Sequence, residues 1–135
     1  MKLAGLTVAY WSVVAAALLP IGCAWLAKWG SFGKPRREGG YDNHAPRAWL
    51  ARQSDWRARA NAAQANSFEA LPFFIGAVII AHQLGAPQLR VDVLAFLYVF
   101  MRVLYVMMYL ANLALMRSMA WVLAFVLNVA ILFAA

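Results

Sequence analysis

The sequence predicts an all-α integral membrane protein, a single four-transmembrane-helix bundle over residues 1–135. Three observations predict this fold: the composition, four long stretches with almost no charge, and the concentration of basic residues in one connection. Of the residues, 65% are hydrophobic and 13% are charged, whereas soluble domains are about half apolar and a quarter charged. A chain this short cannot bury so much apolar surface in one small core. The composition therefore excludes a soluble enzyme, a nucleic-acid-binding module and a disordered tail.

The first span is expected over residues 3–27, because no charge occurs between Lys2 and Lys28. At about 1.5 Å per residue, this run is long enough to cross a hydrocarbon core of about 30 Å. It is too long for the apolar stretch of a cleaved signal peptide, which has about 7–15 residues. Pro20 stands where a lipoprotein box carries a small or aliphatic residue. We therefore expect a retained helix that kinks at Pro20.

Three further spans are expected over residues 57–84, 92–114 and 117–135. The run from Val93 to Met116 contains one charge, Arg102. The sequence Gly-Ala-Pro at 85–87 breaks the chain after the second span, and a tight turn there makes the second and third helices antiparallel neighbours. The third and fourth spans are separated only by the region around residues 114–117.

The connection over residues 28–56 is expected to lie in the cytoplasm, with both termini on the opposite side. Eight of the 12 Lys and Arg residues lie in or beside it, and cytoplasmic loops carry the excess of Lys and Arg. Membrane orientation thus explains the net charge of +7 better than a nucleic-acid partner does. Glycines and prolines indicate a loop, with one short helix after Pro46. Four tryptophans flank this interface as aromatic anchors: Trp25, Trp29, Trp49 and Trp56.

Polar side chains form a stripe on each of the last three helices. At about 100° per residue, Arg59, Asn66 and Glu69 share one side of the second helix. The stripe on the third helix contains Arg102 with Tyr98, Tyr105, Tyr109 and Asn112, and the stripe on the fourth contains Arg117, Trp121, Ala124 and Asn128.

Ionisable side chains inside a span are costly and tend to mark function or subunit contacts. Glu69 is the one carboxylate deep in a span, so we expect it to pair with Arg102 or Arg59. Two interpretations stay open: a buried ion pair that fixes helix register or an oligomer, and a ligand site. The excess of Arg over Glu favours an anionic ligand, because guanidinium groups hold carboxylates by paired hydrogen bonds.

No metal site is expected. The single cysteine, Cys23, excludes a disulfide framework or a cysteine metal site within one chain. The two histidines, His44 and His82, have no partner cluster in the sequence.

Three segments in order resemble the MAPEG family, the membrane-associated proteins in eicosanoid and glutathione metabolism, and especially its small bacterial branch. The segment 59–74, RANAAQANSFEALPFF, resembles the second-helix element Asn-x-x-Glu-x-x-Pro-Phe. Arg102-x-x-Tyr105-x-x-x-Tyr109 resembles the third-helix element, and Arg117-Ser118 resembles the start of the fourth helix. The resemblance covers almost the whole chain.

The resemblance implies a homotrimer in the bacterial inner membrane that binds glutathione between subunits near the cytoplasmic face. Asn66 and Glu69 would hold the amino end and backbone of glutathione, and Arg102, Tyr105 and Tyr109 its carboxylates and peptide groups. Arg117 would lie beside the sulfur and favour the thiolate as the catalytic residue, with Ser118 nearby. The implied activity is a glutathione-dependent transferase or peroxidase that acts on lipophilic small molecules from the bilayer.

Two positions depart from active members of the family. Ala62 stands where animal members commonly carry Arg, and Trp121 stands where eicosanoid-making members carry Tyr. An indole N–H donates one hydrogen bond but cannot act as a hydroxyl acid. The alternative is therefore a catalytically silent protein of the same fold, a scaffold or accessory subunit of a larger membrane complex or a lipid-binding protein. A transporter or channel subunit is a third hypothesis, but the two halves show no inverted repeat.

Overall fold

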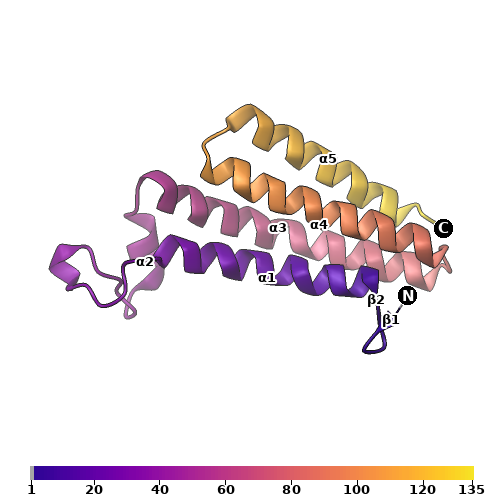
Figure 1. The fold of residues 1–135 in the computed structure, drawn as a ribbon, viewed down its shortest axis with the longest axis horizontal. Helices are drawn as coiled ribbons and strands as arrows, with labels where there is room; N and C mark the ends of the chain where they lie inside the picture. Colours follow the sequence, from indigo (N-terminus) through magenta and orange to yellow (C-terminus); the bar gives the residue numbers. More distant parts are fainter. Residues whose placement is uncertain (1) are drawn as a thin grey trace.

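Four long helices lie side by side along one axis in the computed structural model, which describes residues 2–135 (Figure 1). Each helix is long and apolar enough to cross a membrane. The predicted four-helix membrane fold is confirmed. The helices are α1 (Val8–Lys28), α3 (Asp55–Gln83), α4 (Gln88–Leu110) and α5 (Ala114–Leu132).

The first helix begins later than the predicted span, at Val8 instead of residue 3. The residues before it form a small hairpin of β1 (Lys2–Leu3) and β2 (Leu6–Thr7). Its turn places Ala4 and Gly5 at positive φ, 51° and 80°, which a helix cannot continue through. Thr7 then caps α1, because its Oγ1 accepts a hydrogen bond from the amide of Tyr10 at 3.2 Å.

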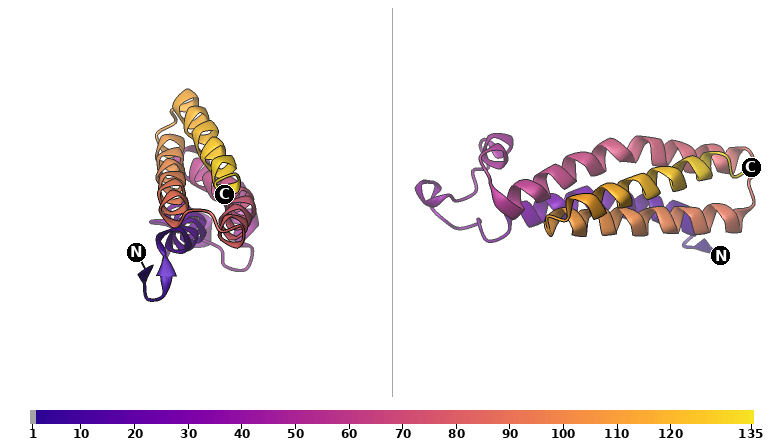
Figure 2. Two further views of the ribbon diagram at one scale, coloured as in Figure 1. Left: turned by 90° about the vertical axis from the view of Figure 1, so that its right-hand side faces the viewer. Right: turned by 90° about the horizontal axis from the view of Figure 1, so that it is seen from above.

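The connection between α1 and α3 lies at the end of the bundle opposite to both termini (Figures 1 and 2). It contains the 3₁₀ helix η1 (Arg36–Glu38) and the short helix α2 (Pro46–Ala51). The predicted helix after Pro46 is thus present, with the proline in its first turn, where the missing N–H costs nothing. Trp49 and Leu50 of α2 pack with Ala27 and Ala60, so the connection is anchored to the ends of α1 and α3.

The turn between α4 and α5 lies at residues 111–113, three residues or more before the predicted boundary. Asn112 has a φ of 59°, a left-handed conformation that Asn tolerates better than most residues. This single residue ends α4 at Leu110 and lets α5 start at Ala114. Hydropathy could not locate the turn, because no charge or Gly-Pro pair marks it.

Small side chains allow the helices to pack closely. Helix α1 packs on α3 and α4, and α5 packs on α4 and α3. Large apolar side chains such as Leu18, Trp25 and Leu115 point outward, as expected where lipid is the solvent. The buried side of α1 consists of Ala9, Ser12, Ala16, Pro20, Cys23 and Ala27.

A polar cluster joins the helices at the end of the bundle that holds the termini. The Oδ1 atom of Asp92 accepts hydrogen bonds from the Ala9 amide and from Gln88 Nε2, both at 2.8 Å. His82 stacks on Tyr10 with ring centroids 4.4 Å apart, and its Nδ1 donates to the Val78 carbonyl at 2.7 Å. These contacts fix the start of α1 against α3 and α4.

Candidate functional site

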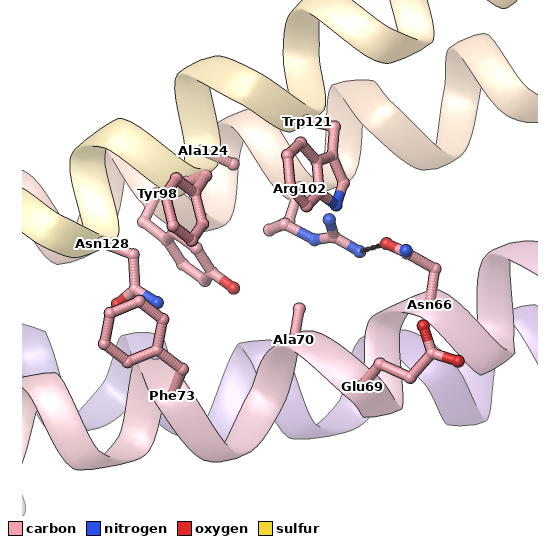
Figure 3. Close-up of a pocket in the computed structure, with 10 residues that line it drawn as sticks. Asn66, Glu69, Ala70, Phe73, Tyr98, Arg102, Trp121, Ala124 and Asn128 are labelled. Atoms are coloured by element: carbon pink, nitrogen blue, oxygen red, sulfur yellow. Dashed lines mark hydrogen bonds between the residues drawn. The ribbon is translucent and has the colours of Figure 1, made fainter.

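A cavity of about 190 Å³ lies between α3, α4 and α5 (Figure 3). It combines polar groups at both ends with aromatic and small side chains along its walls. Three of its lining residues are predicted site residues: Asn66, Glu69 and Arg102. Trp121 is one of the two positions that depart from the family pattern, and the other lining residues have no predicted role in binding. The lining residues are Asn66, Glu69, Ala70, Phe73, Tyr98, Arg102, Trp121, Ala124, Phe125 and Asn128.

Arg102 is the central cation of this cavity. Its side chain is 3% exposed, and its Nη2 donates to Asn66 Oδ1 at 2.8 Å (Figure 3) and to Ser67 Oγ at 3.4 Å. Both acceptors are uncharged. Among residues 2–135 the one ion pair is Arg36 with Asp42, in the connection between α1 and α3. Among these described residues, the guanidinium charge of Arg102 therefore has no paired carboxylate.

The expected pairing of Glu69 with Arg102 or Arg59 is wrong within the single chain, which forms no such ion pair. Glu69 is exposed at the edge of the cavity, and Asn66, one helical turn earlier, takes the position beside the Arg102 guanidinium. Arg59 is bonded elsewhere, since its Nε donates to the Leu110 carbonyl at 3.1 Å. The carboxylate of Glu69 is thus free to meet a ligand or another subunit.

Three predicted residues continue from the cavity along α4 to the start of α5. The Arg102 guanidinium lies 4.3 Å from the Tyr105 ring centroid, and the Tyr105 and Tyr109 rings meet edge to face at 5.7 Å. The Arg117 guanidinium then lies 4.2 Å from the Tyr109 ring centroid. We call these four side chains the Arg–Tyr ladder. It places its two cations at opposite ends of two phenols. Arg102 and Tyr105 are buried, whereas Tyr109 and Arg117 are half-buried and can meet a ligand from outside the chain.

Ser118 lies apart from this ladder. Its side chain is exposed, and its Oγ donates to the Ala114 carbonyl of its own helix at 3.1 Å. The structure therefore brings Asn66, Glu69 and Arg102 together in the cavity and leaves Ser118 on the outer surface of α5.

The far end of the cavity contains residues that were not predicted as site residues. Tyr98 and Asn128 lay on the predicted stripes of their helices, and both are 3% exposed. The Oδ1 atom of Asn128 has no hydrogen-bond partner among the described residues. Their position on a stripe that faces other helices could have identified them as candidates. The cavity itself could not be predicted, because it depends on the small size of Ala70 and Ala124, and the sequence does not show which helices these alanines face.

The two departures from the family pattern lie in different surroundings. Trp121 lies on the cavity wall and stacks on Phe125, with ring centroids 5.6 Å apart. On the helix of Ala62, Arg57 Nη1 donates to the Ala27 carbonyl at 3.1 Å, and Arg59 Nε donates to the last carbonyl of α4. Both cations thus bond to the C-terminal ends of neighbouring helices.

Within residues 2–135 no three His, Cys, Asp or Glu side chains are grouped so that they could hold a metal ion. The site is built from guanidinium, phenol, amide and carboxylate groups. Such groups bind an organic anion through hydrogen bonds and charge.

The chain was compared with protein families, curated proteins and solved structures. The sequence model of the MAPEG family matches residues 8–135, nearly the whole chain, which confirms the resemblance seen in the motifs. No curated protein and no solved structure matched. This match and the four membrane-spanning helices identify an integral membrane protein with a glutathione-related transferase, peroxidase or related role in general. The chain belongs to the MAPEG family.

Proposed function

We propose that the protein is a membrane-bound glutathione-dependent transferase or peroxidase that acts on lipophilic substrates. In this proposal it is a homotrimer in the bacterial inner membrane, with both termini extracytoplasmic and residues 28–56 in the cytoplasm. Glutathione is the co-substrate, and it is held between subunits near the cytoplasmic face. Family membership and the geometry of the Arg–Tyr ladder support this assignment.

The uncompensated charge of Arg102 is the observation that carries the proposal. A charged side chain inside a span is costly unless it pairs, and a buried ion without a partner destabilises the fold. Arg102 donates to two neutral acceptors, both through Nη2. A carboxylate of glutathione would supply the missing anion.

The other site residues take roles according to their position. Asn66 and Glu69 lie at the edge of the cavity, where an amide and a free carboxylate can receive the amino group of glutathione. Tyr105 and Tyr109 offer hydroxyls to the peptide groups. Arg117, at the other end of the ladder, would hold the sulfur as a thiolate, because an adjacent cation lowers the pKa of a thiol. Ser118 lies next to Arg117 on the exposed side of α5, where it would contact the ligand only at its edge.

The size of the cavity supports a site shared between subunits. A cavity of about 150 Å³ holds one benzene ring, so 190 Å³ is too small for a whole tripeptide. Glutathione would therefore extend from the cavity towards Tyr109 and Arg117, which are half-buried and which a neighbouring protomer can cover. Exposed Phe73, Trp121 and Phe125 frame the cavity and give lipophilic substrates access from the bilayer.

The chemistry follows from a thiolate held beside an apolar surface. In conjugation, the sulfur forms a bond to an electrophilic carbon, and the leaving group departs with its electron pair. In peroxide reduction, two glutathione molecules become a disulfide while the hydroperoxide yields an alcohol and water. The Trp121 indole can donate one hydrogen bond to a departing group but cannot supply a hydroxyl proton.

Calorimetry of glutathione binding to the purified protein in detergent tests the proposal. Arg102→Gln should weaken binding by about tenfold to 150-fold, the range for a lost hydrogen bond to a charged group. Arg52→Gln removes the same charge from an exposed site in the connection and should leave binding unchanged. Light scattering checks that both variants keep the oligomeric mass. Equal affinity in all three proteins would contradict the assignment.

A catalytically silent scaffold or accessory subunit is the second candidate function. It is favoured by one observation: Arg57 and Arg59 are bonded to helix ends and do not replace the cation absent at Ala62. In this case Glu69 would pair with a cation of another subunit. Glu69→Ala should then dissociate the oligomer in mild detergent, whereas the enzyme hypothesis predicts an intact oligomer with weakened glutathione binding.

A further inference from the structure

The inner end of the cavity holds an amide without a partner. Asn128 is 3% exposed, and its Oδ1 accepts no hydrogen bond among residues 2–135. A buried polar atom without a hydrogen-bond partner destabilises the fold, so a polar residue at this depth in a span favours a ligand that bonds to it.

A second polar group faces the same space. Tyr98 is 3% exposed, and its hydroxyl points into the cavity, while Asn128 lies at the cavity's far end (Figure 3). The Tyr98 ring is fixed from behind by Phe74, with ring centroids 4.0 Å apart. Packing of its ring therefore holds the hydroxyl in place, without a hydrogen bond to any residue from 2 to 135.

The walls between these two groups suit a flat ring. Phe73 and Phe125 have ring centroids 6.0 Å apart, and Trp121 stacks on Phe125 with an interplanar angle of 5°. Ala70 and Ala124 come from facing helices and leave the space between them open (Figure 3). The whole cavity, including its Arg102 end, measures about 190 Å³, which is more than the roughly 150 Å³ that accommodates benzene, so a small substituted ring fits in it when glutathione is absent.

We propose that this inner end of the cavity is a binding site for a hydroxylated aromatic ring, a phenol-class ligand that enters from the bilayer. The ring lies between the alanines and aromatic side chains. Its hydroxyl donates to the Asn128 amide oxygen and accepts from the Tyr98 hydroxyl. The site goes beyond the proposed function, because it needs no glutathione and uses neither Arg117 nor Tyr109.

Tryptophan quenching by a brominated probe tests this site in the full chain, reconstituted in lipid nanodiscs without glutathione. The probes are 4-bromophenol and bromobenzene, which differ by the hydroxyl. The signal is the difference between the native protein and Trp121→Phe, so that quenching of the other five tryptophans by probe in the bilayer cancels. We expect saturable quenching by 4-bromophenol and weaker binding of bromobenzene.

Two variants remove the polar groups separately. Asn128→Leu keeps the shape of the side chain, and Tyr98→Phe keeps the ring. Each should weaken 4-bromophenol binding by about fivefold to tenfold, the value of one hydrogen bond, and leave bromobenzene unaffected. Asn61→Leu, on another face of α3 and outside the cavity, is the matched control and should change neither probe.

The outcomes separate this inference from the proposed function. Non-saturable quenching, equal affinity for both probes, or unchanged binding in both variants would overturn the phenol site. Calorimetry of glutathione with Asn128→Leu should match the native protein. A protein that binds 4-bromophenol but not glutathione would contradict the proposed function and support the phenol site, and the reverse result would overturn the phenol site alone.

Discussion

Replacing Asp92 should destabilise the bundle by an amount that its contacts determine. Asp92 is 6% exposed, and one of its oxygens accepts from the first turn of α1 and from Gln88. Hydrogen bonds between helices in membranes average about 0.6 kcal/mol and reach about 1.7, while bonds to charged groups contribute about 1.5–3. The two ranges overlap at about 1.5 kcal/mol per hydrogen bond. Two hydrogen bonds to the Asp92 carboxylate should therefore contribute about 3 kcal/mol together. Asp92→Ala should lower the free energy of unfolding by that amount.

The conservative variant separates charge from shape. Asp92→Asn keeps one acceptor oxygen, and two neutral bonds of about 0.6 kcal/mol each would remain. It should therefore lose about 2 kcal/mol instead of 3. Tryptophan fluorescence during unfolding by SDS in mixed micelles measures both values. Asp42→Asn, which removes a carboxylate that pairs with Arg36 in the connection, is the control and should change stability by less than about 1 kcal/mol.

Unfolding of Asp92→Ala at the same SDS fraction as the native protein would refute a stabilising role of these two hydrogen bonds. In that case the start of α1 is held by its small-residue contacts alone. A loss for Asp92→Asn equal to that for Asp92→Ala would show that the charge and not the oxygen geometry matters.

Two further predictions follow from contacts near the site. Arg59→Gln should lower stability by about 0.3–1 kcal/mol, because the Leu110 carbonyl at the end of α4 loses its cation; the same SDS titration measures this, and an unchanged midpoint would refute it. Trp121→Tyr should raise the rate of glutathione-dependent conjugation or peroxide reduction, since it returns a hydroxyl to the cavity wall. Trp121→Phe should not raise this rate, and an equal gain in both variants would refute the role of the hydroxyl.

The four spans could be predicted because hydrocarbon imposes a length of about 20 apolar residues on each of them. The exact helix ends could not be predicted. The hairpin before Val8 depends on Ala4 and Gly5 at positive φ, and the turn before α5 depends on Asn112 at positive φ. Neither turn contains a charged residue that would mark the end of its span. Pro46 and the 85–87 turn were predictable because proline and glycine restrict the backbone directly.

The polar stripes were predictable from helix periodicity, and their pairing was not. Arg102, Tyr98 and Tyr105 are buried together, as the 100° rotation indicates. The partner of Arg102 depends on the axial shift between α3 and α4, which places Asn66 instead of Glu69 at hydrogen-bond distance. Packing of small residues across the interface between the two helices sets that shift, and the shift cannot be predicted from a single sequence. The cavity is unpredictable for the same reason.

We expect glutathione to bind beside the Arg–Tyr ladder as a thiolate. Ultraviolet absorbance of the thiolate, recorded across pH on the protein saturated with glutathione, measures the pKa of the bound thiol. This pKa should lie below the value of about 8.5 for a free cysteine thiol, so that the thiolate is present at lower pH than in solution. Arg117→Gln should return the pKa towards that value. A bound thiol that titrates as in solution, or no binding at millimolar glutathione, would show that the ladder does not hold a thiolate.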